Sequence, residues 1–502
     1  MRKVAALAAL LLAGACAKAP SGPLVISVSY LVNSLDPHAW NYLGDFSIAS
    51  HFYEPLVTND AEMRLQPCLA RSWENPDPHT WVLHLQPGVT FHSGRPLRAR
   101  DVVFTIRRLQ TEQGLEMTGW IAYVSEVAAL DDLTVRIRTQ RPFAVLLNKL
   151  RFVAIVPEGA SAATLAQQPD GTGPYTFAGW TKGVSIRMAR NPRYRAQPPP
   201  IDAVTFRLGR EPEQAAADLQ SGQSQLVQCD SKKVAARLER SGFAVRRRTT
   251  LRLEYLGYDL HSARTPYASD RSNPFLDPLV RRALHLAFDR RRLVERLTTD
   301  AVAANQLVPP FVFGFNPSLP ETACDPEEAR RLLRKAGRSE GFRVTLHARS
   351  RFQETAEELR EQLRPLGIQV EVRLLPQDEF LDMARRREVS LYVSRYGCLS
   401  GDASDVLDNG VHSPDAAGQM GLHNYGGYSN PELDRLIEES AGIEPAGLRR
   451  HALENLMARL MEDLPWLPLY FGQDVYVMDE ALTWTPRCDS FVLAAEVARR
   501  RR

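Results

Sequence analysis

The sequence lacks a charge excess of either sign. Its 502 residues include 62 lysines and arginines against 59 aspartates and glutamates, for a formal net charge of +3. A dedicated nucleic-acid-binding protein carries a clear basic excess, so this balance argues against nucleic acid as a partner. The one strongly basic stretch is the arginine run 499–502, which we interpret as a solvated tail, with contact to anionic lipid as the alternative.

The sequence also lacks the motifs of common catalytic and metal sites. We find no HExxH, P-loop or GxGxxG pattern, and Gly427-Tyr-Ser-Asn-Pro431 lacks the final glycine of a nucleophile elbow. No CxxC pair is present, and His79 and His84 fall on opposite faces of a predicted strand, which is poor metal geometry. We therefore predict a protein without catalytic residues, cofactor or bound metal; an exported hydrolase is a weak alternative.

Long apolar runs are absent except for a short one at the N-terminus. Arg2 and Lys3 precede an uncharged apolar run at 4–15, which is too short to cross a bilayer and is typical of an export signal. The run ends in Ala13-Gly14-Ala15-Cys16, which resembles a bacterial lipobox, although Ala13 stands where leucine is usual. We expect residues 1–16 to be a signal peptide ending at a lipidated Cys16, and residues 17–23 to be a tether. Ordinary secretory cleavage is the alternative.

Export would place the mature protein in the periplasm or at the cell surface, on a membrane that the sequence does not identify. Disulfides can form there. Six cysteines are present, and lipidation of Cys16 leaves an odd number, so at least one thiol must stay free. The spacing does not determine the pairing. The remaining cysteines are Cys68, Cys229, Cys324, Cys398 and Cys488.

The composition is otherwise globular, with 44% hydrophobic and 24% charged residues, and the length favours two or three domains. Between 277 and 395, predicted helices and strands alternate. Asp277 and Pro278 can begin a helix with an apolar stripe, and a capping-box pattern at 325–328 begins another. This alternation predicts an α/β lobe with parallel strand pairs. The strands are expected at 342–348, 368–374 and 389–393.

The loop that follows the last of these strands is the best candidate for ligand contact. Ligands of open α/β sheets bind outside the carboxyl ends of the strands, and residues 396–405 leave such an end. The loop is rich in small and polar residues and turn formers. We therefore expect it to line a binding site.

Several segments, in order along nearly the whole mature chain, carry a resemblance to a known family. They are Tyr53-Glu-Pro-Leu-Val57, Leu69-Ala-Arg-Ser-Trp-Glu74, the stretch 80–97 leading into Asp101-Val-Val-Phe104, Gly171-Thr-Gly-Pro-Tyr175, Arg281-Arg-Ala-Leu-His-Leu-Ala-Phe-Asp-Arg290, Asn430-Pro-Glu-Leu-Asp434 and Leu464-Pro-Trp-Leu-Pro-Leu-Tyr470. Together they resemble the family 5 extracellular solute-binding proteins of bacteria, which include dipeptide, oligopeptide and nickel binding proteins.

The resemblance implies a periplasmic-binding-protein-like fold of type II. Two α/β lobes would face each other across a cleft, with an extra domain packed on the first lobe. We expect crossings between the lobes near 250–259 and 468–475. The expected boundaries are 24–48, 166–250 and 475–502 for lobe I, 49–165 for the extra domain and 260–467 for lobe II.

The resemblance also implies the binding component of an ABC importer. Such a protein captures a small solute by lobe closure and delivers it to a membrane permease. We expect a monomer, held to the membrane by its lipid, with a peptide as the leading ligand class. The alternatives are another ligand (an oligosaccharide, an opine, haem or a metal chelate) and a sensor or chaperone on the same fold.

Family position implies the ligand residues. In peptide-binding members an aspartate in the loop holds the α-amino group of the ligand; the matching position here is Leu399, which cannot pair with an ammonium group. Asp402 or Asp405 could replace it with a shifted register, with turn capping as the alternative. For Trp180, core packing is the alternative to lining the cleft. The full set of candidates is Asn33, Trp180, Tyr396, Cys398, Leu399, Asp402 and Asp405.

Overall fold

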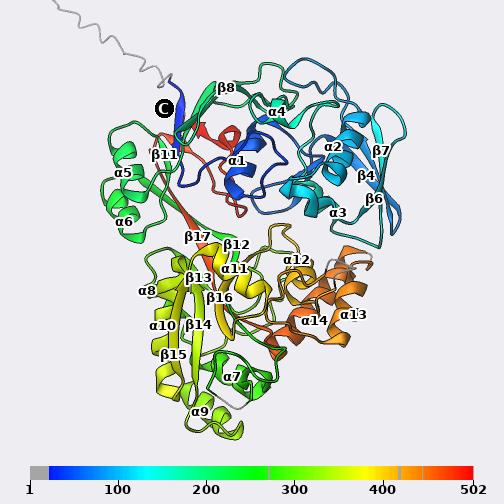
Figure 1. Ribbon diagram of the computed structural model, residues 1–502. Coiled ribbons are helices and arrows are strands. Elements are labelled where there is room, and N and C mark those ends of the chain that lie inside the picture. Colours follow the sequence, from blue (N-terminus) through cyan, green and yellow to red (C-terminus); the bar gives the residue numbers. More distant parts are fainter. Residues whose placement is uncertain (1–21, 270–271, 416–419, 444, 501–502) are drawn as a thin grey trace, which may run out of the picture.

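The computed structural model describes residues 22–269, 272–415, 420–443 and 445–500. The expected signal peptide, the lipidated Cys16 and most of the tether lie outside these residues. Figure 1 shows two bodies, one above the other, joined by long strands. We call the upper body, with the blue and green N-terminal elements, lobe I, and the lower body lobe II.

A single mixed sheet runs through both lobes. Strands β14–β16 belong to lobe II, β1 and β8–β11 belong to lobe I, and β12 and β17 extend through both (Figure 1). The strand order is β15 (Gln369–Leu375), β14 (Arg343–Arg349), β16 (Leu391–Gly397), β12 (Ala244–Tyr258), β17 (Trp466–Met478), β11 (Leu226–Gln228), β1 (Leu24–Ser27), β10 (Ala203–Arg207), β9 (Ser185–Arg190) and β8 (Tyr175–Thr181), and β13 (Ala301–Ala303) also pairs with β17. The mixed α/β architecture predicted from the sequence is confirmed.

The shared strands β12 and β17 form one antiparallel ladder that changes register between the lobes. In lobe I, residues 244–249 pair with 473–478, and in lobe II residues 253–257 pair with 466–471. The Thr250 hydroxyl lies at the shift and donates a hydrogen bond to the Gly472 carbonyl at 2.9 Å. Because a bulge bends a strand locally, we place the hinge at this shift. The expected crossings include it, and their boundaries stay a prediction.

A second, antiparallel sheet accompanies lobe I. Its order is β4 (Ala70–Asp77), β5 (Thr80–Leu85), β7 (Thr134–Thr139) and β6 (Val124–Ala129), and helices α2 (Ala99–Thr111) and α3 (Leu146–Leu150) share its apolar core. It lies within residues 49–165, where we expect the extra domain; that division also stays a prediction. The other elements of this half are α1 (Leu43–Phe52), β2 (Val57–Asn59), β3 (Leu65–Pro67), α4 (Ala162–Leu165), α5 (Pro212–Gln220), α6 (Lys232–Arg240), β18 (Leu482–Thr483) and β19 (Ala498–Arg499).

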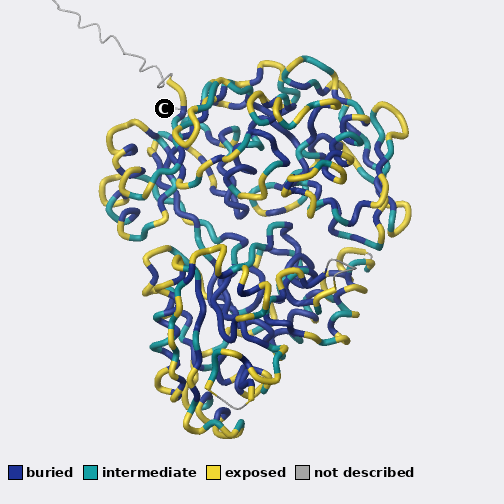
Figure 2. The backbone as a smooth tube through the Cα atoms, viewed as in Figure 1, coloured by how far each residue is buried: buried dark blue, intermediate teal, exposed yellow. Residues whose placement is uncertain are grey.

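Lobe II has the parallel strands that the sequence predicts, since β14 pairs in parallel with both β15 and β16. Helices α7 (Pro278–Ala287), α9 (Pro326–Lys335) and α10 (Gln353–Leu363) share one core on this sheet. Helices α11 (Gln377–Arg385), α13 (Pro431–Ser440) and α14 (Ala446–Asp463) share another. Figure 2 shows the buried chain inside both lobes and exposed segments around it. The short helices α8 (Arg290–Arg296) and α12 (Ser404–Val406) complete the lobe.

The predicted helix starts in lobe II are confirmed. The Asp277 carboxylate accepts a hydrogen bond from the backbone N–H of Leu279 at 2.8 Å, with Pro278 in the first turn. Asp325 caps α9 through the N–H of Glu328 at 2.9 Å. Both caps satisfy N–H groups that the helix itself leaves unpaired.

The five cysteines in the described part of the chain are free thiols, and all but Cys324 are buried. Among the helices that the structure describes, none combines the length and the apolar character needed to cross a bilayer.

The glycines of Gly171-Thr-Gly-Pro-Tyr175 are explained by close backbone contact with the end of α1. The N–H of Gly173 donates to the Phe52 carbonyl at 2.8 Å. A Cβ atom on Gly171 would lie 2.0 Å from the same carbonyl oxygen, and a backbone atom cannot rotate away as a side chain can.

We therefore expect Gly171→Ala to lower the free energy of unfolding by about 3 kcal/mol or more, the upper end of overpacking effects. Urea denaturation followed by circular dichroism measures the loss. The control is Gly447→Ala in α14, where nothing lies within 4 Å of the new Cβ; the change there should stay below about 1 kcal/mol. Equal midpoints for Gly171→Ala and the unsubstituted protein would contradict this account.

Candidate functional site

The loop after β16 is one of the places where lobe II contacts the extra-domain region. Helix α3 supplies the contacts from the other side. The Asn148 side chain donates to the Ser400 carbonyl at 2.9 Å, and Lys149 lies 4.0 Å from the Asp405 carboxylate. Just beyond the helix, Arg151 donates to the Leu399 carbonyl at 3.3 Å. The predicted ligand loop therefore lies at the boundary between the lobes.

Asp402 is tied to lobe II itself. Arg449 of α14 donates to both of its carboxylate oxygens, at 2.6 and 2.8 Å, and both side chains are buried. The same carboxylate caps the turn at Ser404 through a backbone N–H at 3.0 Å. Buried charges are retained when they are paired in this way. The predicted contact of Asp402 with a solute stays a prediction, but its contacts within the chain are those of a structural ion pair.

Asp405 and Tyr396 are held in contact by hydrogen bonds. The Tyr396 hydroxyl donates to the Asp405 carbonyl at 2.8 Å, and the N–H of Ser400 donates to the Asp405 carboxylate at 3.2 Å. The Tyr396 ring is half-buried and meets His423 edge-on, with 5.8 Å between ring centroids. Tyr396 therefore presents a fixed ring next to the exposed side chain of His423.

Cys398 and Leu399 serve packing. The Cys398 thiol is buried and lies 3.1 Å from the Asp402 carbonyl, to which it donates; burial raises the pKa of this thiol. Leu399 is half-buried and packs against both the extra-domain core and the lobe II core. These contacts are those of packing residues, and contact of either residue with a solute stays a prediction.

The structure does not bring the other two candidates to this loop. Asn33 is exposed after β1, where its backbone N–H and side-chain amide donate to the Asp45 carboxylate at 2.9 and 3.0 Å. Trp180 lies on β8, the edge strand of lobe I at the opposite end of the sheet from lobe II, and packs against the lobe I core (Figure 1). The geometry thus favours core packing for Trp180, which was the alternative.

A cluster of charges at the shared strands was missed by sequence reasoning. Arg252 of β12 pairs with Asp474 of β17 at 2.5 Å, and Arg395 of β16 pairs with Glu254 of β12 at 2.5 Å. Glu254 is fully buried, yet one of its carboxylate oxygens, Oε2, has no hydrogen-bond partner among the described residues, and neither does Arg252 Nε. Unsatisfied buried polar atoms are rare and call for an explanation.

The lobe II side of this cluster is cationic. Arg349 is the last residue of β14, Arg351 lies two residues further on, and both are close to Arg395. Burial, together with the neighbouring guanidiniums, lowers the pKa of Arg351 to about 10 and lowers that of Arg349. Arg349 donates to the Gln377 side chain at 3.2 Å, and Arg351 contacts the Phe352 ring but forms no ion pair with a described residue. In the described part of the chain, Glu254 is therefore the one carboxylate paired with this set.

The lobe I side is anionic. Asp230 lies two residues after β11, and Ser29 Oγ, after β1, donates to it at 3.3 Å. Asp230 is exposed to solvent, yet desolvation and the nearby Asp474 raise the pKa of its carboxyl group. Arg351 and His423 likewise combine exposure with a desolvation-lowered pKa. The strands that precede Asp230 and Arg351, β11 and β14, both end at the boundary between the lobes, beside the shared strands β12 and β17.

We call this region the interlobe recess. Its floor is Arg252 and Glu254 of the shared strand β12. Lobe I contributes carboxylates and lobe II contributes guanidiniums to opposite walls. The wall residues are Asp230 and Asp474 on lobe I, and Arg349, Arg351 and Arg395 on lobe II.

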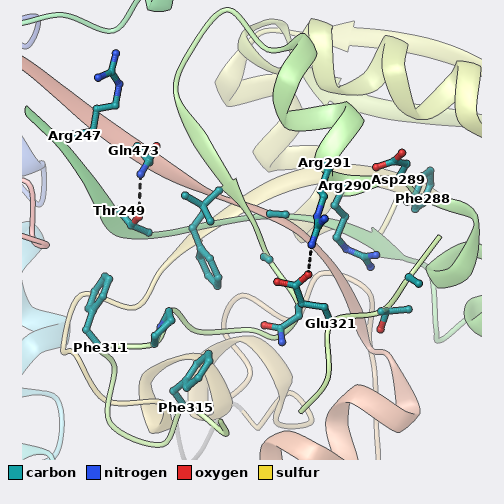
Figure 3. A pocket seen from close by; sticks show the side chains of 18 of the residues that line it. Arg247, Thr249, Phe288, Asp289, Arg290, Arg291, Phe311, Phe315, Glu321 and Gln473 are labelled. Atoms are coloured by element: carbon teal, nitrogen blue, oxygen red, sulfur yellow. Dashed lines mark hydrogen bonds and ion pairs between the residues drawn. The ribbon is translucent and has the colours of Figure 1, made fainter. Parts of the chain in front are cut away.

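A separate cavity of about 850 Å³ lies at the β13 edge of the shared strands. Figure 3 shows Phe311 and Phe315 on one side of it and Arg290 and Arg291 on the other, with Arg291 paired to Glu321 at 2.8 Å. Arg247 pairs with Asp300 and Arg248 with Glu62, whereas Arg290 donates to the Pro468 carbonyl at 2.8 Å and pairs with no described carboxylate. Most of the positive charge around this cavity is therefore balanced by carboxylates of the chain itself.

Comparison with protein families decides the class of the protein. The model described as "Bacterial extracellular solute-binding proteins, family 5 Middle" matches residues 64–418, which is more than half of the chain. The chain belongs to this family. It is therefore an extracytoplasmic solute-binding protein of the ABC importer type and not an enzyme, as the motifs predicted.

Individual relatives agree with this membership. The glutathione-binding protein GsiB of Pectobacterium atrosepticum is 25% identical over 476 residues, which cover 91% of this chain and 90% of the relative. HbpA2 from Haemophilus parasuis superposes with a TM-score of 0.85 at 21% identity, over 95% of this chain and 100% of that one. DppA from Helicobacter pylori, in complex with the peptide STSA, superposes with a TM-score of 0.76 at 22% identity. The match covers 95% of this chain and 98% of that one. These two structures establish the likeness of fold.

The Asp402–Arg449 pair generates a test. We expect Asp402→Asn to lower the free energy of unfolding by about 3 kcal/mol, because it removes the negative charge that accepts two hydrogen bonds from the buried Arg449 guanidinium. Chemical denaturation at pH 7 measures this. The exposed Asp378→Asn in α11 serves as the control, and its effect should stay below about 1 kcal/mol. A variant with unchanged stability would show that the ion pair does not hold the loop.

Proposed function

We propose that this protein captures a small peptide, or a similar solute bearing carboxylate groups, in the interlobe recess and delivers it to a membrane permease. The main observation behind this proposal is the cationic wall formed by Arg349, Arg351 and Arg395, for which the described residues supply one paired carboxylate, Glu254. The lipid-anchored form expected from Cys16, and the monomeric state, are part of the proposal.

Energetics favour an anionic group on this wall. Neighbouring guanidiniums that are partly desolvated repel one another. A carboxylate relieves this repulsion and can accept two parallel N–H bonds from one arginine. The wall therefore selects a solute with at least one carboxylate.

Lobe closure follows from the position of the recess. Its floor is the strand that both lobes share, and its two walls belong to different lobes. A solute touches both walls only when the lobes are together, so its binding stabilises the closed arrangement by the difference in contact energy. The contacts of Asn148 and Arg151 with the loop after β16 would add to that arrangement. A permease can then recognise the closed shape.

A peptide is the best-supported class. The GsiB relatives are named for binding glutathione, a small peptide with carboxylates, and the cationic wall suits such a ligand. Opines also carry carboxylates, so the same wall supports them as the second candidate. Neutral oligosaccharides gain nothing from the guanidiniums.

Titration calorimetry with reduced glutathione and trialanine tests the proposal. Loss of one charge-assisted contact removes about 1.5–3 kcal/mol, so Arg351→Ala should weaken binding by about 10- to 100-fold. Arg351→Lys should retain part of the affinity because it keeps the charge without the fork of donors. The exposed Arg282→Ala in α7 is the matched control and should bind as the unsubstituted protein does. Equal affinity of Arg351→Ala and Arg282→Ala would refute the role of the cationic wall.

A further inference from the structure

The loop after β16 has no carboxylate left to hold an ammonium group. Leu399 carries no charge, and Asp402 is taken up by Arg449 at 2.6 and 2.8 Å. Asp405 accepts from Ser400 N–H at 3.2 Å and lies 4.0 Å from Lys149. If the solute carries an amine, its counter-charge must come from another part of the recess.

Asp230 of lobe I is in the right place to supply that charge. It follows the carboxyl end of β11, which lies beside the carboxyl end of the parallel strand β1. The carboxylate is exposed, its hydrogen bond from Ser29 Oγ at 3.3 Å is neutral, and no described side chain forms an ion pair with it. Arg252, whose charge acts on it, is paired with Asp474 at 2.5 Å.

The groups around Asp230 favour the binding of a cation at this position. Asp474 adds a second negative charge, and desolvation together with that charge raises the pKa of the Asp230 carboxyl. On the floor next to this pair, Glu254 Oε2 is buried without a partner, and Gly472 leaves the adjoining space open. A Cβ on Gly472 would lie 3.8 Å from Glu254 Oε2 and 3.7 Å from Arg252 Nε.

We infer that Asp230 binds the ammonium group of the solute from lobe I, while the guanidiniums of lobe II bind its carboxylate. This inference rests on the proposed function and adds to it the second half of the ligand's chemistry. The ligand is then a zwitterion whose opposite charges bridge the two lobes. The amine is therefore recognised on the lobe I wall, and not by the lobe II loop, where Leu399 occupies the position of the aspartate found in peptide-binding members.

Two probe pairs test the assignment: reduced glutathione and trialanine, each with a free and with an acetylated amine, measured by titration calorimetry at pH 7. The unsubstituted protein should prefer each free amine by at least about tenfold, the value of one charge-assisted contact. Asp230→Asn should lose about that much affinity for the free amines and bind both forms alike. Arg351→Ala should weaken both forms equally, and the control Asp378→Asn should change neither.

The outcomes separate this inference from the proposed function. Undiminished binding of the free amines by Asp230→Asn, or retained preference over the acetylated forms, overturns the role of Asp230 and leaves the proposed function standing. Binding of no probe by the unsubstituted protein overturns both. A thermal melt of each variant verifies folding, and Asp230→Asn should melt with the unsubstituted protein because the side chain is exposed.

Discussion

The pairing of β12 with β17 is the constraint on which the rest of the structure depends. The two strands run through both lobes as one antiparallel ladder, so the lobes cannot separate without breaking it. Its change of register between Thr249 and Leu253, followed by a second between Glu254 and Tyr255, leaves rotation as the easiest motion. The ladder also fixes where the site lies, because the carboxyl ends of β1 and β11 in lobe I, and of β14 and β16 in lobe II, meet beside it.

Charge is used in two different ways on the two sides of this boundary. Within lobe II, Asp402 and Arg449 form a complete buried pair that fixes the loop after β16. Between the lobes, the charges are segregated, with carboxylates on one wall and guanidiniums on the other. Charged groups with a full set of partners stabilise the scaffold. Charged groups that lack an ion-pair partner can instead bind a solute. The 850 Å³ cavity at the β13 edge differs from the interlobe recess, because three of its four arginines, Arg247, Arg248 and Arg291, pair with carboxylates of the chain.

Sequence patterns predicted much of lobe II, because its helices and strands carry local signals. The Asp277 and Asp325 caps and the alternating strands are examples. The role of Asp402 could not be read this way, since its partner Arg449 is distant in sequence and no local pattern links them. Trp180 was ambiguous because an aromatic side chain suits a core as well as a cleft. Arg351 had a usable signal: the rule that pointed to the loop after β16 applies equally to the end of β14.

The central claim is that one solute spans the recess, with its two charges on different lobes. A crystal structure of the protein saturated with reduced glutathione tests this directly. The account predicts an amine within hydrogen-bond distance of Asp230 and a carboxylate within that distance of Arg351. Glutathione bound in the cavity beside Phe311 and Phe315, or touching one lobe alone, would contradict it.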